Sequence, residues 1–275
     1  MAKVDSLDLS RPVIEQLDDI YWLPFDAPPV HHYDLGDWHL SFTGKLVKHI
    51  YGANYYAPYT TPIYNEDSYP RFYGGQPLWG NKSPYIWFKL NSVSADCSVD
   101  VGPEDAWIVG TASFKLLVIQ VRESSKSGIF DLTDQNQLKQ FIFNKHKSDL
   151  DHLQGLGSED FFSAWSPDEI QRYRIRGRNW YEIIDGNLGV NWCFNLYTHL
   201  SDKHLLHIAY IPSQFWPPYH IPSEKALRVS KSPLWDFMDN LELSKMEEGS
   251  QVVTGTIERE ATSSWEEDTE DLSSW

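Results

Sequence analysis

The stretch that decides the fold begins at Tyr173, ends at Pro212 and reads YRIRGRNWYEIIDGNLGVNWCFNLYTHLSDKHLLHIAYIP. Apolar and polar residues alternate through most of it, and a period of two is typical of β-strands with one buried face. Two turns interrupt the pattern, one between Gly186 and Gly189 and one at Ser201-Asp202-Lys203. The stretch therefore predicts a meander of three antiparallel strands.

The register of this meander decides which side chains share a face, because a shift of one residue moves every side chain to the other face. The first turn, taken as residues 186–189, places Tyr181 opposite Phe194. The second turn places Phe194 opposite Tyr210. One face then forms a predicted core of Tyr181, Ile183, Phe194, Leu196, Leu206, Ile208 and Tyr210.

The opposite face of the predicted meander carries the candidate ligand-binding residues. Upstream, Arg172 and Arg174 continue the same parity, so that four arginines fall within seven residues of an acidic chain. A guanidinium presents a planar fork of donors that suits carboxylate or phosphate, and aromatic rings beside it can stack on a ligand. Two alternatives stay open: a solvated face neutralised by the protein's own acids, or a face covered by the acidic tail. The candidate residues are Arg176, Arg178, Trp180, Tyr197, His199 and His207.

Composition narrows the class of protein. The chain has 275 residues, of which 41% are hydrophobic, and its formal net charge is −16. Such an acidic surface repels phosphate backbones and anionic membranes, so direct nucleic-acid binding is not expected. The N-terminal sequence shows no secretory leader, and no apolar run is long enough to span a membrane. We expect a cytoplasmic protein that does not engage membranes.

Outside the meander, four helices are predicted: over 13–21, over 134–147, from Ser166-Pro167, and from Ser232-Pro233 through Leu241. Strands are predicted over 38–42, 85–90, 106–110 and 113–122. The tyrosine- and proline-rich residues 51–84 predict a long ordered loop region on the core. The fold class expected is α+β, with a mainly antiparallel sheet of five to seven strands, three or four helices, aromatic-rich loops, and one domain over residues 1–246.

Residues 247–275 form a separate acidic segment. They carry nine acidic residues and one basic residue, a composition typical of a disordered tail. The tripeptide Ser263-Ser264-Trp265 recurs as Ser273-Ser274-Trp275. A tryptophan in a solvated tail has no evident folding role, so Trp265 and Trp275 are the candidate partner-binding residues. The alternative is a tail that only keeps the protein soluble.

Catalytic signatures are missing from the sequence. It contains no GxSxG, HExxH, GxGxxG or GxxxxGK[ST] motif. The cluster of His31, His32, Asp34, Asp37 and His39 has metal-ligating side chains, but its spacing matches no established motif, so neither a metal nor a cofactor is predicted.

Two functions remain after these exclusions. The first is a non-catalytic interaction protein (an adaptor, inhibitor or immunity-type protein) that engages a protein partner, for which a basic one suits the charge, through its acidic surface and tail. The alternative is a small-molecule or anion-binding domain, or an enzyme, with its site on the strand face of Arg176, Arg178 and Trp180.

Overall fold

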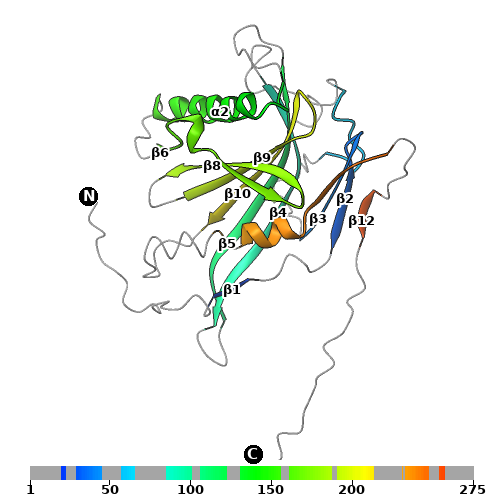
Figure 1. Cartoon of the computed structure of the whole chain (residues 1–275). Helices are drawn as coiled ribbons and strands as arrows, with labels where there is room; N and C mark the ends of the chain where they lie inside the picture. Colours follow the sequence, from blue (N-terminus) through cyan, green and yellow to red (C-terminus); the bar gives the residue numbers. More distant parts are fainter. Residues whose placement is uncertain are drawn as a thin grey trace, which may run out of the picture.

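The computed structural model is built mainly from antiparallel β-sheet (Figure 1). It describes residues 20–22, 29–44, 57–65, 85–100, 106–122, 131–155, 161–187, 191–213, 231, 233–247 and 254–257. Within these residues, no helix combines the length and apolar character needed to cross a membrane.

The larger sheet has eight strands in the order β1-β4-β5-β10-β9-β8-β6, with β7 paired to β8 outside this path. Its two longest strands form one antiparallel hairpin and follow each other in the chain. Sequential neighbours pair throughout β7 to β10, which is the predicted meander with one extra strand. The strands are β1 (Ile20–Trp22), β4 (Tyr85–Asp100), β5 (Ala106–Val121), β6 (Phe161–Phe162), β7 (Gln171–Ile175), β8 (Arg178–Asn187), β9 (Asn191–His199) and β10 (His204–Ser213).

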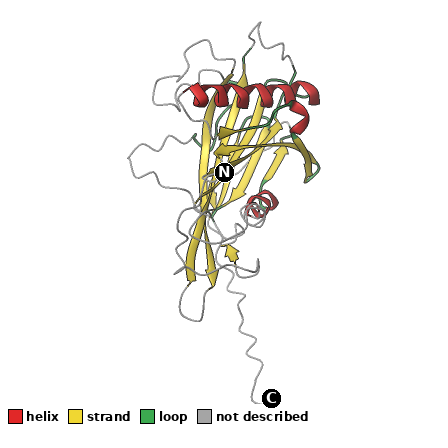
Figure 2. Cartoon of the chain, turned by 90° about the vertical axis from the view of Figure 1, so that its left-hand side faces the viewer, coloured by secondary structure: helices red, strands yellow, loops and turns green. Residues whose placement is uncertain are grey.

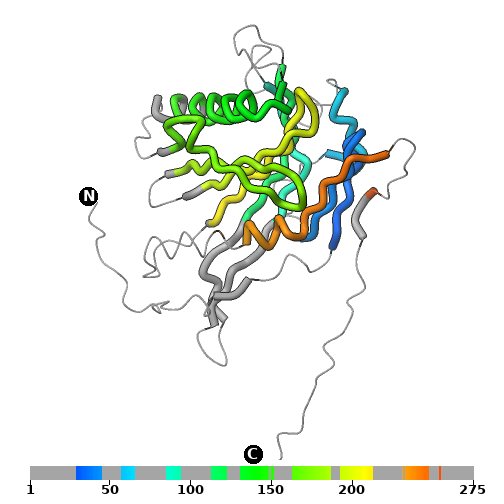
Figure 3. The backbone as a smooth tube through the Cα atoms, viewed as in Figure 1, coloured from blue at the N-terminus to red at the C-terminus, as the bar shows by residue number. Residues whose placement is uncertain are grey.

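A second sheet of four strands, in the order β11-β3-β2-β12, lies beside the first. It consists of β2 (Val30–Asp34), β3 (Trp38–Thr43), β11 (Glu242–Lys245) and β12 (Gly255–Ile257). Figure 3 shows the C-terminal segment that carries β11, in orange, running alongside the blue strands β2 and β3. Segments about 200 residues apart in the chain therefore share one small sheet.

Three helical elements accompany the sheets in the part of the chain that the structure describes. Helix α2 (Gln135–Gly155) runs across the strands of the larger sheet (Figure 2). Its first turn is capped by Asp134, whose Oδ1 accepts the backbone N–H groups of Asn136 and Gln137 at 2.9 Å each. The other two elements are a 3-10 turn, η2 (Pro167–Glu169), and a short helix over residues 233–239.

Two hydrophobic cores lie on opposite faces of the larger sheet. The first lies against the four-stranded sheet and the short helix, where the Phe237 ring stacks 4.3 Å from the Phe114 ring and 6.0 Å from that of Phe42. The second lies under α2 and includes Ile142 and Tyr197. Burying one such phenylalanine ring stabilises the fold by about 2–3 kcal/mol. The larger sheet is therefore covered on both faces.

The register predicted for the meander is half right. The pairing of β9 with β10 is confirmed, with Phe194 opposite Tyr210. The pairing of β8 with β9 was wrong by three residues, because Ile184, not Tyr181, lies opposite Phe194. The ladder continues through Gly186 and Asn187 before the chain turns. An odd shift exchanges the faces of β8, so Trp180 enters the first core while Tyr181 and Ile183 face α2.

The physical reason for this error is that both faces of β8 are covered. A period of two locates the core only when one face meets solvent, and here either parity buries large side chains. The meander also contains a hairpin that was not predicted: the chain turns at Arg176 and Gly177, so Arg172 and Arg174 lie on β7 rather than upstream on the same strand as Arg178.

Several other predictions can be compared with the structure. The described residues contain two α-helices and one 3-10 turn, fewer than the three or four helices predicted. Of the helix predicted over 13–21, residues 13–19 lie outside the described residues, while Ile20 and Tyr21 belong to a strand. The two strands predicted over 106–122 are one continuous strand. Residues 57–65 lie on the first core, as expected for part of the aromatic loop region.

The predicted domain boundary at residue 246 stays a prediction. Beyond it, Gly255–Ile257 pairs with β2, so a short piece of the acidic segment belongs to the smaller sheet. The tail tryptophans Trp265 and Trp275 lie outside the described residues.

Candidate functional site

The hairpin between β7 and β8 positions the predicted arginines. Its two turn residues, Arg176 and Gly177, have φ angles of +48° and +78°. Positive φ at both central residues is the geometry of a type I′ turn, which matches the twist of the flanking strands and favours glycine. Ile175 pairs with Arg178 across the turn. Arg176 is therefore held at the tip and Arg178 at the start of β8.

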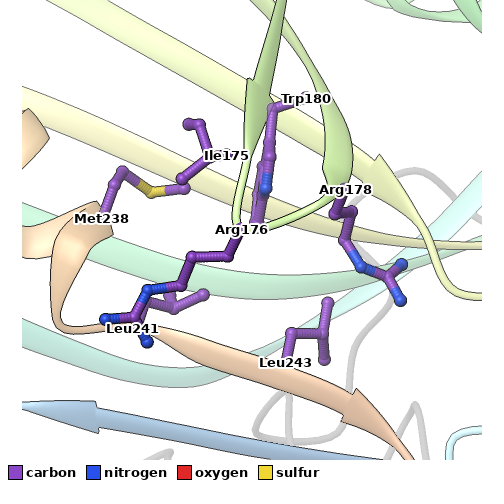
Figure 4. Close-up of a pocket in the computed structure, with 7 residues that line it drawn as sticks. All are labelled: Ile175, Arg176, Arg178, Trp180, Met238, Leu241 and Leu243. Carbon is purple, nitrogen blue, oxygen red and sulfur yellow. The ribbon is translucent and has the colours of Figure 1, made fainter.

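A small cavity lies beneath this hairpin (Figure 4). It offers about 20 Å³ of space that a water molecule can enter, enough for one water or for one oxygen of a larger ligand. The two guanidinium groups point in different directions from the hairpin (Figure 4). The cavity is lined by Ile175, Arg176, Arg178, Trp180, Met238, Leu241 and Leu243.

Arg176 is bound to the segment that follows the short helix. Its guanidinium donates to Glu242 Oε1 at 3.2 Å and to the backbone carbonyl of Asp239. Both side chains of the ion pair are exposed, so this pair contributes little to stability. Its effect is to tie the hairpin tip to the smaller sheet.

Arg178 has a different environment. It is half-buried, its guanidinium lies 4.2 Å from the centre of the Trp38 ring, and it donates one hydrogen bond, to the His199 carbonyl at 2.9 Å. No carboxylate of the described residues forms an ion pair with it. Burial lowers the pKa of the guanidinium, with no acidic side chain acting against that effect. Arg172 and Arg174 of the same hairpin also form no ion pair among the described residues, but both are exposed, so its burial distinguishes Arg178.

The other four candidate residues divide between the two faces of the larger sheet. Trp180 is buried and lines the cavity with the arginines. Tyr197 and His207 are buried on the opposite face, under α2. His199 is half-buried; burial, and next the charge of Arg178, lower its pKa. The structure thus brings together Arg176, Arg178 and Trp180 and separates them from Tyr197 and His207.

The separated pair belongs to a buried polar network that sequence reasoning missed. His146 of α2 lies between two strands, with Nδ1 2.5 Å from Asp185 Oδ2 and Nε2 2.7 Å from the Tyr197 hydroxyl. The Tyr197 ring stacks on His207 at 4.2 Å. In the sequence, Leu138, Ile142 and His146 follow one another at spacings of four, which places the histidine on the apolar stripe of the helix. This position was the signal that could have predicted a buried histidine.

The same network continues along β9. Asn195 donates to Asp185 Oδ1 at 3.1 Å, and its own Oδ1 lies 2.9 Å from His207 Nε2. Burial, followed by the charges of Lys145 and His146, lowers the pKa of His207. The Cys193 thiol donates to Asn195 at 3.5 Å. Because burial raises the pKa of this free thiol, it stays protonated and is a poor nucleophile.

The order carboxylate, imidazole, hydroxyl resembles that of nucleophilic catalysts. The hydroxyl here belongs to Tyr197, whose exposed fraction is 0% and whose ring is covered by His207. A substrate therefore cannot reach it in this structure. The network's evident effect is to join α2 to β8, β9 and β10 through satisfied buried groups.

A second buried charge lies on the other face of β8. Glu182 Oε2 accepts bonds from Lys231 Nζ at 2.7 Å and from the Tyr173 hydroxyl at 3.0 Å. Burial, and next the carboxylate of Glu182, raise the pKa of Tyr173 to about 12, so its hydroxyl remains a donor. Lys231 also lies over the rings of Tyr173, Phe194 and Trp235.

An exposed tryptophan lies before the 3-10 turn. The exposed fraction of Trp165 is 90%, the highest of any large hydrophobic residue described. The Ser166 side chain makes no cap bond to this turn; instead Glu169 Oε2 accepts the Trp165 backbone N–H at 3.3 Å. Trp165 is followed by Asp168 and Glu169, much as Trp265 is followed by acids in the tail. Sequence reasoning missed this likeness.

The three histidines of the predicted cluster lie on strands β2 and β3. His32 Nδ1 lies 3.2 Å from His39 Nε2, while His31 is buried and bonds to the Gly44 carbonyl at 2.9 Å. Within the described part of the chain, no group of three or more histidine, cysteine or acidic side chains is arranged to hold a metal ion. The pair is best described as a hydrogen-bonded cross-strand contact.

Comparison of the chain with protein-family models, with curated proteins and with solved structures gives no match. Any functional proposal therefore rests on the geometry of these sites.

Proposed function

We propose that this chain is a non-catalytic interaction protein, and that the cavity beside Arg178 receives an anionic group of its partner or ligand. The observation that carries this proposal is the half-buried guanidinium of Arg178, which has no carboxylate partner among the described residues of an acidic protein. An incoming carboxylate or phosphate would supply the missing charge.

The chemistry of the site favours an anion over other ligands. A guanidinium has five N–H donors, and the Arg178 guanidinium uses one of them on a backbone carbonyl. The guanidinium carbon lies 4.2 Å from the centre of the Trp38 ring, and the Trp38 indole N–H donates to the Leu200 carbonyl at 2.8 Å. A preorganised fork loses little rotamer entropy when it binds an oxyanion.

The size of the cavity limits how the anion binds. Space for about one water admits a single oxygen, so the rest of the ligand lies outside the hairpin. This geometry suits an acidic side chain, a terminal carboxylate or a phosphorylated residue of a partner. It does not suit the enclosure of a whole small molecule.

Anion titration tests this function. Acetate, phosphate and sulfate, added at constant ionic strength against chloride, are expected to raise the Tm saturably and to shift the Trp38 indole resonance. The Arg178→Met variant keeps an apolar stem on Trp38 and should lose both responses. Arg178→Lys keeps the charge but not the fork and should respond more weakly.

The matched control is Arg174→Ala, which removes an exposed arginine of the same hairpin and should behave as the wild type. A response that is equal in the wild type and in Arg178→Met, or no response to any anion in the panel, would overturn the proposal.

A second candidate function is docking of a basic partner at the acidic turn of Trp165. A tryptophan exposed to 90% beside Asp168 and Glu169 presents an apolar anchor with negative charge around it. Tryptophan is enriched among residues that dominate binding energy, and opposite charge speeds encounter. The proposed role of Trp265 and Trp275 in the tail has the same chemistry.

Affinity capture with four proteins tests this second function: the full chain, a chain ending at Ile257 that keeps β12 but lacks Trp265 and Trp275, Trp165→Ala, and Tyr64→Ala as the control for loss of another exposed ring. A partner of basic composition that is lost from Trp165→Ala assigns the turn, and one lost from the shortened chain assigns the tail. Capture that is the same with all four proteins would rule out both surfaces.

A further inference from the structure

Lys231 occupies an enclosure built by strands β7, β8 and β9 and by its own helical segment. Its Nζ lies 5.5 Å from the Tyr173 ring centre, 5.4 Å from that of Phe194 and 5.3 Å from that of Trp235. At the end of the enclosure it meets the Glu182 carboxylate at 2.7 Å. Three ring faces and one carboxylate around a single ammonium are the environment in which cations are recognised.

The Glu182 carboxylate is only half satisfied. Oε2 accepts from Lys231 and from Tyr173, whereas Oε1 is buried and has no hydrogen-bond partner among the residues that the structure describes. The exposed fraction of this side chain is 1%. Leaving a buried carboxylate oxygen without a donor is costly, so the site retains capacity for a further N–H group. Lys231, as a point charge, bonds to only one of the two oxygens.

The lysine enters from the accessible side of the enclosure. Its side chain is 20% exposed and belongs to the same helical segment as Trp235, whereas Glu182 lies on β8, which is paired to β7 and β9. Tyr173 and Trp235, which meet edge to face at 5.0 Å, are both partly exposed. The carboxylate and rings thus form the site, and the lysine is a separable occupant.

We infer that Glu182, Tyr173, Phe194 and Trp235 form a binding site for an alkylammonium or alkylguanidinium group, which Lys231 fills in the free protein. A guanidinium fork can bond both carboxylate oxygens at once, which the lysine does not do. Replacement of Lys231 by such a group exchanges one cation for another. The inference rests on the proposed function in one respect only. If a basic partner docks on this protein, a lysine or arginine side chain of that partner is the source of the cationic group.

Chemical rescue tests the site without a partner. Lys231→Ala removes the atoms of n-propylammonium, so this ion is the probe and N-ethylguanidinium is the second. Each is expected to raise the Tm of Lys231→Ala saturably, by about 3 °C, relative to sodium chloride of equal ionic strength. Neutral 1-propanol should not. If Lys231→Ala is unfolded in sodium chloride, the same readout is recovery of the folded signal with the probe.

Two control variants define the site. Lys231→Ala with Glu182→Gln should lose the rescue, because the carboxylate is gone. Lys245→Ala, which removes an exposed lysine, should show no probe effect beyond that of salt. Rescue that survives Glu182→Gln, that equals the propanol effect, or that does not occur would overturn the inference.

A peptide-binding experiment distinguishes the cation site from the proposed docking of a basic partner. An arginine-containing basic peptide should bind Lys231→Ala at least tenfold more tightly than the wild type. Rescue by n-propylammonium without any peptide binding would leave the cation site standing and would remove the basic partner as its ligand.

Discussion

The Arg178 guanidinium lies 4.2 Å from the centre of the Trp38 ring, and this contact joins β8 of the larger sheet to β3 of the smaller one. The two residues are 140 positions apart in the chain. Because the first core lies between these sheets, the contact closes one end of it. The same arginine is the proposed anion ligand, so binding and sheet packing are coupled at one side chain.

This coupling predicts an interaction energy between Arg178 and Trp38. A double-mutant cycle with Arg178→Met and Trp38→Leu, measured by urea unfolding, should give about 1 kcal/mol of coupling, the value expected for a partly desolvated cation–π contact. Trp38→Leu alone also removes the indole bond to the Leu200 carbonyl. Strict additivity of the two changes would show that the contact contributes nothing.

The His146 network predicts a non-additive pattern of a different kind. Tyr197→Phe deprives His146 Nε2 of its hydroxyl contact at 2.7 Å and should cost about 1–3 kcal/mol of unfolding free energy. Tyr197→Phe combined with His146→Leu should cost less than the sum of the single changes, because no buried polar group is left opposite an apolar one. Asn144→Ala, on the exposed side of α2, is the control and should change stability by less than about 0.5 kcal/mol.

Stability is expected to fall as the pH decreases from neutrality, with His204 among the causes. Burial lowers the pKa of His204 from 6.5 to about 4, and the charge of Asp202 opposes this only in part. The unfolded chain therefore binds the proton more tightly between these values, so the stability contribution is present above pH 6.5 and is lost as the pH falls towards 4. The loss amounts to about 3 kcal/mol.

Urea midpoints at pH 7.5, 6.0, 5.0 and 4.5 check this expectation. His204→Gln, which keeps a polar side chain near Ser201, should show a shallower decrease over the same range. Burial also lowers the pKa of His207, so part of the decrease in stability with falling pH should remain in that variant. An equal slope in the wild type and in His204→Gln would contradict the assignment to His204.

The hairpin turn predicts opposite effects of two substitutions. Gly177 has a φ of +78°, and a Cβ added there would meet no atom within 4 Å, so Gly177→Ala tests backbone strain alone and should destabilise by about 1 kcal/mol. Arg176→Asn creates the Asn-Gly pair that type I′ turns favour. It should leave stability unchanged or raise it, since the ion pair it removes is exposed. If Arg176→Asn lowers stability as much as Gly177→Ala does, the hydrogen bond from Arg176 to the Asp239 carbonyl contributes more to stability than the Asn-Gly turn gains.

Local pattern predicted the elements that a short turn or an apolar stripe defines. The pairing of β9 with β10 follows from the short turn at Ser201-Asp202-Lys203. The helix that became α2 and the last helix, with Leu234, Phe237 and Met238 buried, follow from helical periodicity in the sequence. The small sheet was not predicted, because its strands come from both ends of the chain and pairing at such separation leaves no local signal.

The chain by itself determined that Tyr173 to Pro212 would be antiparallel sheet, since alternation and turn residues are local properties. Only the tertiary structure decided which face of β8 holds Trp180, because α2 covers one side of the sheet and the smaller sheet covers the other, and either parity buries large side chains. Packing also decided that Arg178 meets Trp38 rather than Tyr197. The candidate site depends on that choice, since a charge without a partner is defined by its neighbours in space and not by its neighbours in sequence.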